Sequence, residues 1–259
     1  IIVMDKKIGR RMEYHSVNDF RDSAPQKHPV PVVTTSREHG VLLKNAYQNQ
    51  ALVSLIVESE SYSAPASNVL GKIEGESKTE HIILCGHHDT VYGSPGGNDN
   101  ASGTIGVIET ARVLSKMFKY FKIKPILSLY FLTLTGEEQG LQGSKHYAQT
   151  KYLNNKVKPR LVINLDELST GPMKGLVLGF PHLRDFIQKI FDDLNENLSV
   201  HVMSQLDPTS DHYPFFTQGI DASHLWRWRF AERHASAEFH HESADTSDKV
   251  NIPELKNYI

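Results

Sequence analysis

The sequence is poor in cysteine and has no long hydrophobic run. Its one cysteine, Cys85, excludes an intrachain disulfide and a cysteine-rich zinc module. The longest mostly apolar stretch, Pro125 to Thr135, is too short to span a bilayer as a helix. For these 259 residues, a disulfide-stabilised scaffold and a membrane-spanning helix are therefore not expected.

The chain also lacks an excess of either charge. Lysine and arginine number 28 and the acidic residues 30, for a net charge of −2, so neither a nucleic-acid nor a membrane partner is predicted. The hydrophobic share of 39% is ordinary for a globular chain with a sizeable core, whereas the 14 histidines are unusual. The chain starts at Ile1 without an initiator methionine, which we interpret as a piece of a longer protein.

Strand patterns alternate with helix patterns along most of the chain, which predicts an α/β fold: a mixed central β-sheet sandwiched by helices. Strands are expected at 68–73, 81–86, 126–133, 161–165, 200–203 and 219–225, and helices at 105–114 and 183–194. The first 60 residues differ, with an extended run at 29–35, a short helix at 42–47 and a strand at 51–58. We therefore divide the chain into residues 1–60 and a main domain, 61–259.

Polar residues gather where the predicted strands end. In open α/β sheets, binding sites form at the carboxyl ends of the strands. The clusters are Gly86–Thr90, Gly96–Gly103, Thr135–Gly140, Asn164–Glu167 and, near the C-terminus, Phe239–Thr246. We expect them to meet along one edge of the sheet and to form a single site.

The residue types in these clusters favour a site for two metal ions. Zinc binds imidazole and carboxylate, and two dications about 3.5–4 Å apart need a bridging carboxylate. The candidate ligands are His87, Asp99, Glu138, Asp166 and His241. Their carboxylates, with a bridging hydroxide, would roughly neutralise two Zn²⁺ ions per chain.

Two further acids near these ligands have a chemical interpretation. The side chains of Glu137 and Glu138 diverge at a strand end, so one can bind metal while Glu137 serves as general base. Asp89 follows His87 by two residues and is placed to accept the second ring N–H of that ligand. The contiguous Ser210-Asp211-His212 looks like a fragment of a nucleophilic triad, but triad geometry does not require its members to be neighbours in sequence.

In this order, the motifs resemble those of the two-zinc aminopeptidases of peptidase clan MH. They are His-x-Asp, Gly-x-Asn-Asp-Asn-Ala-Ser-Gly, Gly-Glu-Glu-x-Gly-x-x-Gly-Ser, Asn-Leu-Asp-Glu and His-x-x-x-Asp-Thr, and the resemblance covers roughly residues 68–250. It implies the zinc exopeptidase (phosphorylase/hydrolase-like) fold, and that residues 29–58 are the tail of a protease-associated insert.

The resemblance also implies roles for individual residues. His87 and Asp166 would bind one zinc, Glu138 and His241 the other, with Asp99 bridging them. Glu137 would be the general base, with a metal-bridging hydroxide as nucleophile, and the Asp99–Asn100 peptide bond would be cis. Ser210-Asp211-His212 resembles a step common in the family near the substrate pocket, which implies a positioning role. Many members carry a tyrosine just before the late histidine ligand, where it stabilises the oxyanion. This chain has His240 there, whose N–H can donate the same hydrogen bond.

The expected activity is removal of N-terminal residues from peptides, so the expected partner is a peptide with a free N-terminus. Three alternatives remain open: a carboxypeptidase that uses Arg227 or Arg229 for the substrate carboxylate, a one-zinc glutaminyl cyclase, and a non-catalytic receptor-like protein. All the proposed ligands and the general base are present, which argues against a non-catalytic receptor-like protein. A secreted location is favoured over a cytoplasmic one, and the oligomeric state is open.

Overall fold

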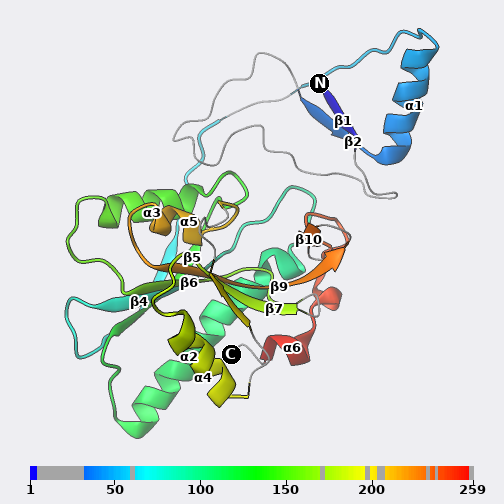
Figure 1. The fold of residues 1–259 in the computed structure, drawn as a ribbon. Coiled ribbons are helices and arrows are strands. Elements are labelled where there is room, and N and C mark those ends of the chain that lie inside the picture. Colours follow the sequence, from blue (N-terminus) through cyan, green and yellow to red (C-terminus); the bar gives the residue numbers. More distant parts are fainter. Residues whose placement is uncertain are drawn as a thin grey trace.

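The computed structural model of the protein describes residues 1–4, 32–58, 62–169, 173–195, 199–202, 208–231, 234–236 and 239–256. Over these residues, the main body is built on an eight-stranded mixed sheet in the order β3-β5-β4-β6-β9-β7-β8, with β10 paired to β9 (Figure 1). The strands are β3 (Val69–Ile73), β4 (His81–His87), β5 (Ser128–Leu134), β6 (Leu161–Leu165), β7 (Met173–Leu178), β8 (Ser199–Val202), β9 (Ala222–Ala231) and β10 (His234–Ser236).

The centre of the sheet is parallel and buried. Strand β4 pairs in parallel with β5 and β6, and β6 pairs in parallel with β9. Alternate residues of β4 serve different faces: Ile83 and Cys85 belong to one hydrophobic cluster, and Leu84 packs against the other. Because parallel strands run the same way, β4, β5 and β6 all end at the same edge.

Helices cover both faces of the sheet, as the alternating pattern predicts (Figure 1). On one face lie α3 (Gln142–Tyr152) and α5 (His212–Phe216), whose Tyr147 and Phe215 belong to the first cluster. On the other lie α2 (Gly103–Phe121), α4 (Arg184–Asp193) and α6 (Ile252–Lys256). A π-helical turn, η1 (Gly97–Ser102), precedes α2, and a 3-10 turn, η2 (Ser247–Lys249), precedes α6. Among the described residues, no helix is both long and apolar enough to cross a membrane.

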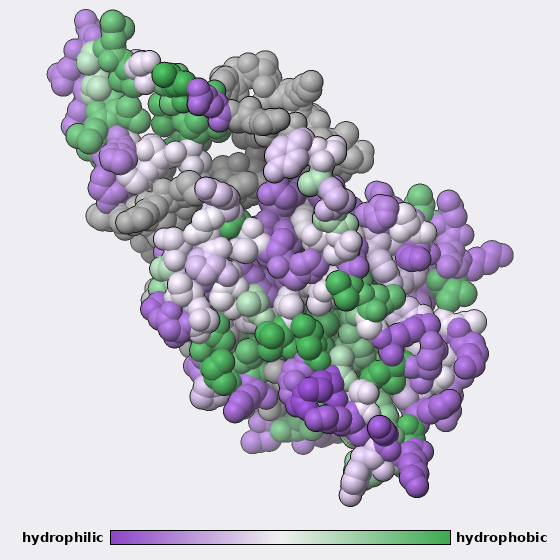
Figure 2. Space-filling model, turned by 180° about the vertical axis from the view of Figure 1, so that it is seen from behind, coloured by the Kyte–Doolittle hydropathy of each residue, from purple (hydrophilic) through white to green (hydrophobic). Residues whose placement is uncertain are grey.

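The N-terminal part forms a small sheet of its own. Strand β1 (Ile2–Met4) pairs in parallel with β2 (Val33–Thr35), and α1 (Arg37–Gln48) follows. The Ser36 hydroxyl caps α1 by accepting the His39 N–H at 3.3 Å. Hydrophobic residues of this part reach its surface (Figure 2), among them exposed Leu42. That it is the tail of a protease-associated insert stays a prediction.

Most predicted elements are present, and one is wrong. The strands around β3, β4, β5 and β6 and the helices α2 and α4 lie where the hydrophobic periodicity indicates. Residues 51–58 form no strand: Leu52 and Leu55 are exposed and no neighbouring strand pairs with them among the described residues. The helix expected at 42–47 starts five residues earlier, at Arg37. The hydrophobic periodicity did not predict α3 or β7.

Candidate metal centre

The polar clusters meet at the carboxyl edge of the sheet, as expected. His87 is the last residue of β4 and pairs in register with Leu134, the last residue of β5. Glu137 and Glu138 follow β5 within four residues, and Asp166 directly follows β6. The parallel register therefore brings these side chains together.

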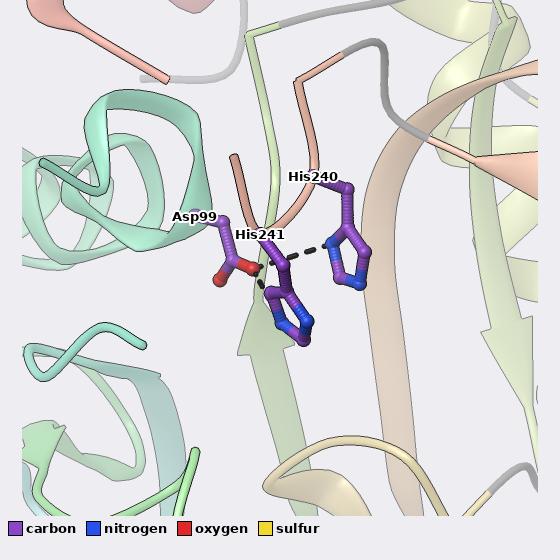
Figure 3. Close-up of side chains that lie close together, drawn as sticks. All are labelled: Asp99, His240 and His241. Atoms are coloured by element: carbon purple, nitrogen blue, oxygen red, sulfur yellow. Dashed lines mark ion pairs between the residues drawn. The ribbon is translucent and has the colours of Figure 1, made fainter. Parts of the chain in front are cut away.

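Asp99 lies at the middle of the site, on η1, where the main chain departs from helical geometry. The Asp99–Asn100 peptide bond is cis, as the family resemblance implies. The Asp99 side chain is buried, and its two oxygens face different histidines. Oδ1 is 3.2 Å from His87 Nε2, and Oδ2 is 3.2 Å from His241 Nε2 (Figure 3 shows the second contact). A carboxylate in this position can bridge two ions.

Each carboxylate oxygen of Asp99 lies in a separate group of candidate ligand atoms. On one side, His87 Nε2 is also 3.3 Å from Asp166 Oδ1. On the other, His241 Nε2 is also 3.2 Å from Glu138 Oε2. The structure thus brings all the predicted metal ligands together, in the two groups that the resemblance implies.

Main-chain contacts orient the first histidine. His87 Nδ1 lies 3.0 Å from the carbonyl oxygen of Asp89, which can only accept, so Nδ1 donates this hydrogen bond and Nε2 is the ring nitrogen that faces the carboxylates. The Asp89 carboxylate, expected to make this contact, is 3.7 Å from Nδ1. It instead accepts the backbone N–H groups of Glu137 at 3.1 Å and Glu138 at 3.2 Å. Asp89 therefore fixes the histidine ligand and the two glutamates together.

Ser210 supports Asp166 in a similar way. Its hydroxyl donates to Asp166 Oδ2 at 2.6 Å and accepts from Asn164 Nδ2 at 2.7 Å. Asp211 accepts instead from the Ser144 hydroxyl, at 2.5 Å. The Ser-Asp-His step therefore positions groups and is not a nucleophilic triad, in agreement with the sequence interpretation.

His240 stacks on His241, with ring centroids 3.7 Å apart (Figure 3). Its Nδ1 is 3.0 Å from Glu167 Oε1 and 3.3 Å from Asp99 Oδ2. Sequence reasoning assigned no role to Glu167, although its place directly after Asp166 was a usable signal. Glu167 ties His240 to the edge of the site.

The buried carboxylates of the centre raise the pKa values of the histidines beside them. Burial opposes the charged form of His87, but Asp166 and Glu137 raise the pKa of this imidazole well above its usual value. Burial also opposes charge on His241, yet hydrogen bonds to Asp99 and Glu138 raise its pKa to about 9. Glu138 Oε1 is buried and has no hydrogen-bond partner among the described residues. The buried carboxylates thus favour positive charge at this place, which a metal dication would supply.

The donor set fits zinc. Ligand atoms of His87, Asp99 and Glu138 all lie within 4.8 Å of one another, as do those of Asp99, His240 and His241. Mixed imidazole and carboxylate donors suit zinc, whereas calcium and magnesium prefer oxygen alone.

Comparison with known proteins agrees with this geometry. The family model described as peptidase family M28 matches residues 68–259. The chain belongs to peptidase family M28. The expected family and its zinc-exopeptidase fold are thereby confirmed.

Several M28 relatives are named aminopeptidases. A probable leucine aminopeptidase 2 of Aspergillus oryzae is 29% identical over 206 residues, which cover 75% of this chain and 40% of the relative. Aminopeptidase YwaD of Bacillus subtilis is 27% identical over 234 residues, 88% of this chain and 49% of the relative. This M28 chain thus spans less than half the length of these two relatives.

A solved structure shows the same fold. The zinc aminopeptidase BSAP of Bacillus subtilis superimposes with a TM-score of 0.75 at 21% identity, over 99% of this chain and 60% of that one.

Proposed function

We propose that this M28 chain carries the catalytic centre of a zinc-dependent aminopeptidase, which removes N-terminal residues from peptides. The observation that carries the proposal is the buried Asp99, whose two oxygens lie 3.2 Å from His87 Nε2 and 3.2 Å from His241 Nε2. One zinc would be held by His87, Asp99 and Asp166, and a second by Asp99, Glu138 and His241. The aminopeptidase names of the relatives support the substrate class.

Zinc at this centre would supply Lewis-acid catalysis, polarising the scissile carbonyl and making water more acidic. Glu137 takes the proton of the attacking water and passes it to the leaving amine. Burial, reinforced by the charge of Asp211, raises the pKa of Glu137 well above its usual value although His87 opposes this. His240 donates a ring N–H to the developing oxyanion.

The experiment compares two peptides, one with a free N-terminus and a blocked C-terminus, the other the reverse. Each is incubated with zinc-loaded wild type, Glu137→Gln and the matched control Glu76→Gln, an exposed glutamate. We expect wild type and control to cleave the free-amine peptide alone and to bind two zinc ions. Glu137→Gln should bind the same zinc and lose about 10²–10⁴-fold in kcat.

Other outcomes separate the alternatives. Cleavage of the free-carboxylate peptide alone would indicate a carboxypeptidase and direct attention to Arg227 and Arg229, whose side chains lie outside the described residues. A single zinc with cyclisation of an N-terminal glutamine would indicate a glutaminyl cyclase. Wild-type protein without bound zinc would refute the proposal.

A further inference from the structure

One buried acid outside the ligand set holds the loop that carries Asp99. Asp245 Oδ1 accepts the backbone N–H of Asn98 at 2.7 Å, and its Oδ2 accepts that of Asp99 at 2.9 Å. The carbonyl oxygen of Asp245 accepts the N–H of Gly97 at 2.9 Å. Three successive backbone N–H groups of η1 thus donate hydrogen bonds to Asp245, which has 0% of its surface exposed.

Asp245 belongs to the same turn as the ligand His241. Its own N–H donates to the Glu242 carbonyl at 3.0 Å, which closes a tight turn at 242–245, within the segment 241–246. This turn lies directly on the loop: a Cβ on Gly97 would be 2.7 Å from the carbonyl carbon of Thr246. The contact therefore joins segments that are distant in sequence: Asp99 and Asp245 are 146 residues apart.

The two halves of the metal centre differ in their need for this contact. His87 and Asp166 end or directly follow β4 and β6, which are hydrogen-bonded neighbours in the sheet. His241 lies on a turn outside the sheet, and its Nε2 must stay 3.2 Å from Asp99 Oδ2. Asp245 holds both the turn of His241 and the backbone of Asp99.

We propose that Asp245 is a positioning residue, which couples docking of the 241–246 turn to binding of the metal ion held by Asp99, Glu138 and His241. Because binding and docking are linked, each stabilises the other to the same extent. The other ion shares only Asp99 with this contact, because His87 and Asp166 are fixed by neighbouring strands, so it depends on Asp245 less. This inference rests on the proposed two-metal centre.

The test replaces one carboxylate oxygen by an amide nitrogen. Asp245→Asn keeps the shape of the side chain but presents an N–H₂ group to a backbone N–H. One of the two hydrogen bonds that the side chain accepts from Asn98 and Asp99 is therefore lost. The control is Asp193→Asn, an exposed carboxylate on α4 that bonds to Lys189 and lies outside both segments. In the metal-free proteins, amide hydrogen exchange should speed up in 97–99 and 239–246 for Asp245→Asn and stay unchanged for the control.

Zinc titration then assigns the effect to one ion. In a His87→Ala background, Asp245→Asn should weaken the remaining zinc about 10–100-fold, the usual range for outer-shell substitutions. In a His241→Ala background, the same change should weaken the remaining zinc clearly less, because only Asp99 of its ligands contacts Asp245.

Wild type offers a test that does not depend on a variant folding. Saturating zinc should slow exchange in 97–99 and 239–246, as linkage requires. Unchanged exchange on adding zinc, or equal weakening of zinc in both backgrounds, would overturn the coupling. If wild type binds no zinc, the proposed function fails, while the metal-free exchange comparison still reports whether Asp245 holds the loop.

Discussion

Asp99 is the residue on which both halves of the proposed centre depend. Its carboxylate oxygens face His87 and His241, and its backbone N–H is held by Asp245. Hydrogen bonds from His240, His241 and His87 outweigh the effect of burial and hold the pKa of Asp99 well below its usual range. The neighbours of Asp99 thus keep it ionised, as a bridging ligand must be.

His240 can be tested separately from the ligands. His240→Phe keeps a ring against His241 but removes the N–H groups, so kcat should fall about 10²–10³-fold with zinc content unchanged. His240→Tyr should retain more activity, because a phenol O–H can donate the same bond. Steady-state kinetics and zinc analysis measure both effects, with His182→Phe, a mostly exposed histidine, as control. Equal activity of His240→Phe and wild type would assign the oxyanion donor elsewhere.

His81 should make folding depend on pH at a distance from the metal centre. Its buried ring stacks on Tyr130, with centroids 4.4 Å apart, and its Nε2 lies 3.0 Å from the Tyr152 hydroxyl. Burial, aided by the charge of Lys72, lowers the pKa of His81 below its usual 6.5. The unfolded chain therefore binds this proton at a higher pH than the folded one, so stability falls as the pH drops below about 6.5.

The measurement for His81 is the urea midpoint at about pH 7.5 and 5.5. We expect a smaller loss between these pH values in His81→Gln than in wild type, and no such difference for the exposed control His39→Gln. Identical losses in wild type and His81→Gln would contradict the assignment.

At the scale of elements, the site depends on close approach of backbones at the start of α2. A Cβ on Gly103 would lie 2.2 Å from the Leu165 carbonyl oxygen, at the end of β6. The Asn100 side chain completes the junction, because its Nδ2 donates to the same carbonyl at 2.9 Å and its Oδ1 accepts the Gly103 N–H at 2.8 Å. The loop of Asp99 is thereby pressed against the strand that leads to Asp166.

Gly103→Ala should disrupt this junction. Since the nearest atom belongs to a backbone, the added methyl group must displace the loop, and we expect a loss of about 1–3 kcal/mol in the free energy of unfolding, with weaker zinc binding. Chemical denaturation and zinc titration test this. Gly71→Ala is the control, because its Cβ would meet Phe131 at an ordinary 3.8 Å. A variant as stable as the control would show that the loop accommodates the methyl group freely.

At the scale of the whole molecule, the centre joins segments from most of the main body. The proposed ligands come from the ends of β4, β5 and β6, from η1 and from the turn before α6, so metal binding would close contacts that are distant in sequence. The unfolded chain presents no such arrangement. Zinc should therefore stabilise the fold as a whole.

Removal of metal tests this directly. A ligand that binds only the folded state at 100 times its Kd adds about 2.7 kcal/mol, so a chelator should lower Tm by several degrees and added zinc should restore it. Differential scanning calorimetry measures the change, with magnesium as control, because magnesium prefers oxygen ligands. A Tm that changes neither with chelator nor with added zinc would argue against a metal centre.

The sequence by itself determined the fold class, the family and the proposed ligands. Hydrophobic periodicity is local, so β4, β5, β6, α2 and α4 could be predicted from neighbouring residues. The candidate ligands follow these strands directly, and parallel pairing then brings them to one edge. Periodicity failed at 51–58, because an apolar run forms a strand only where another strand pairs with it.

Only the tertiary structure decided which groups hold the proposed ligands in place. The carbonyl rather than the carboxylate of Asp89 orients His87, Ser210 supports Asp166, and Asp245 holds the loop of Asp99. These hydrogen bonds depend on atomic positions to within a few tenths of an ångström. Ser210 and Asp245 reach their partners from 44 and 146 residues away. No local pattern encodes such a distance, because chain folding alone brings these segments into contact.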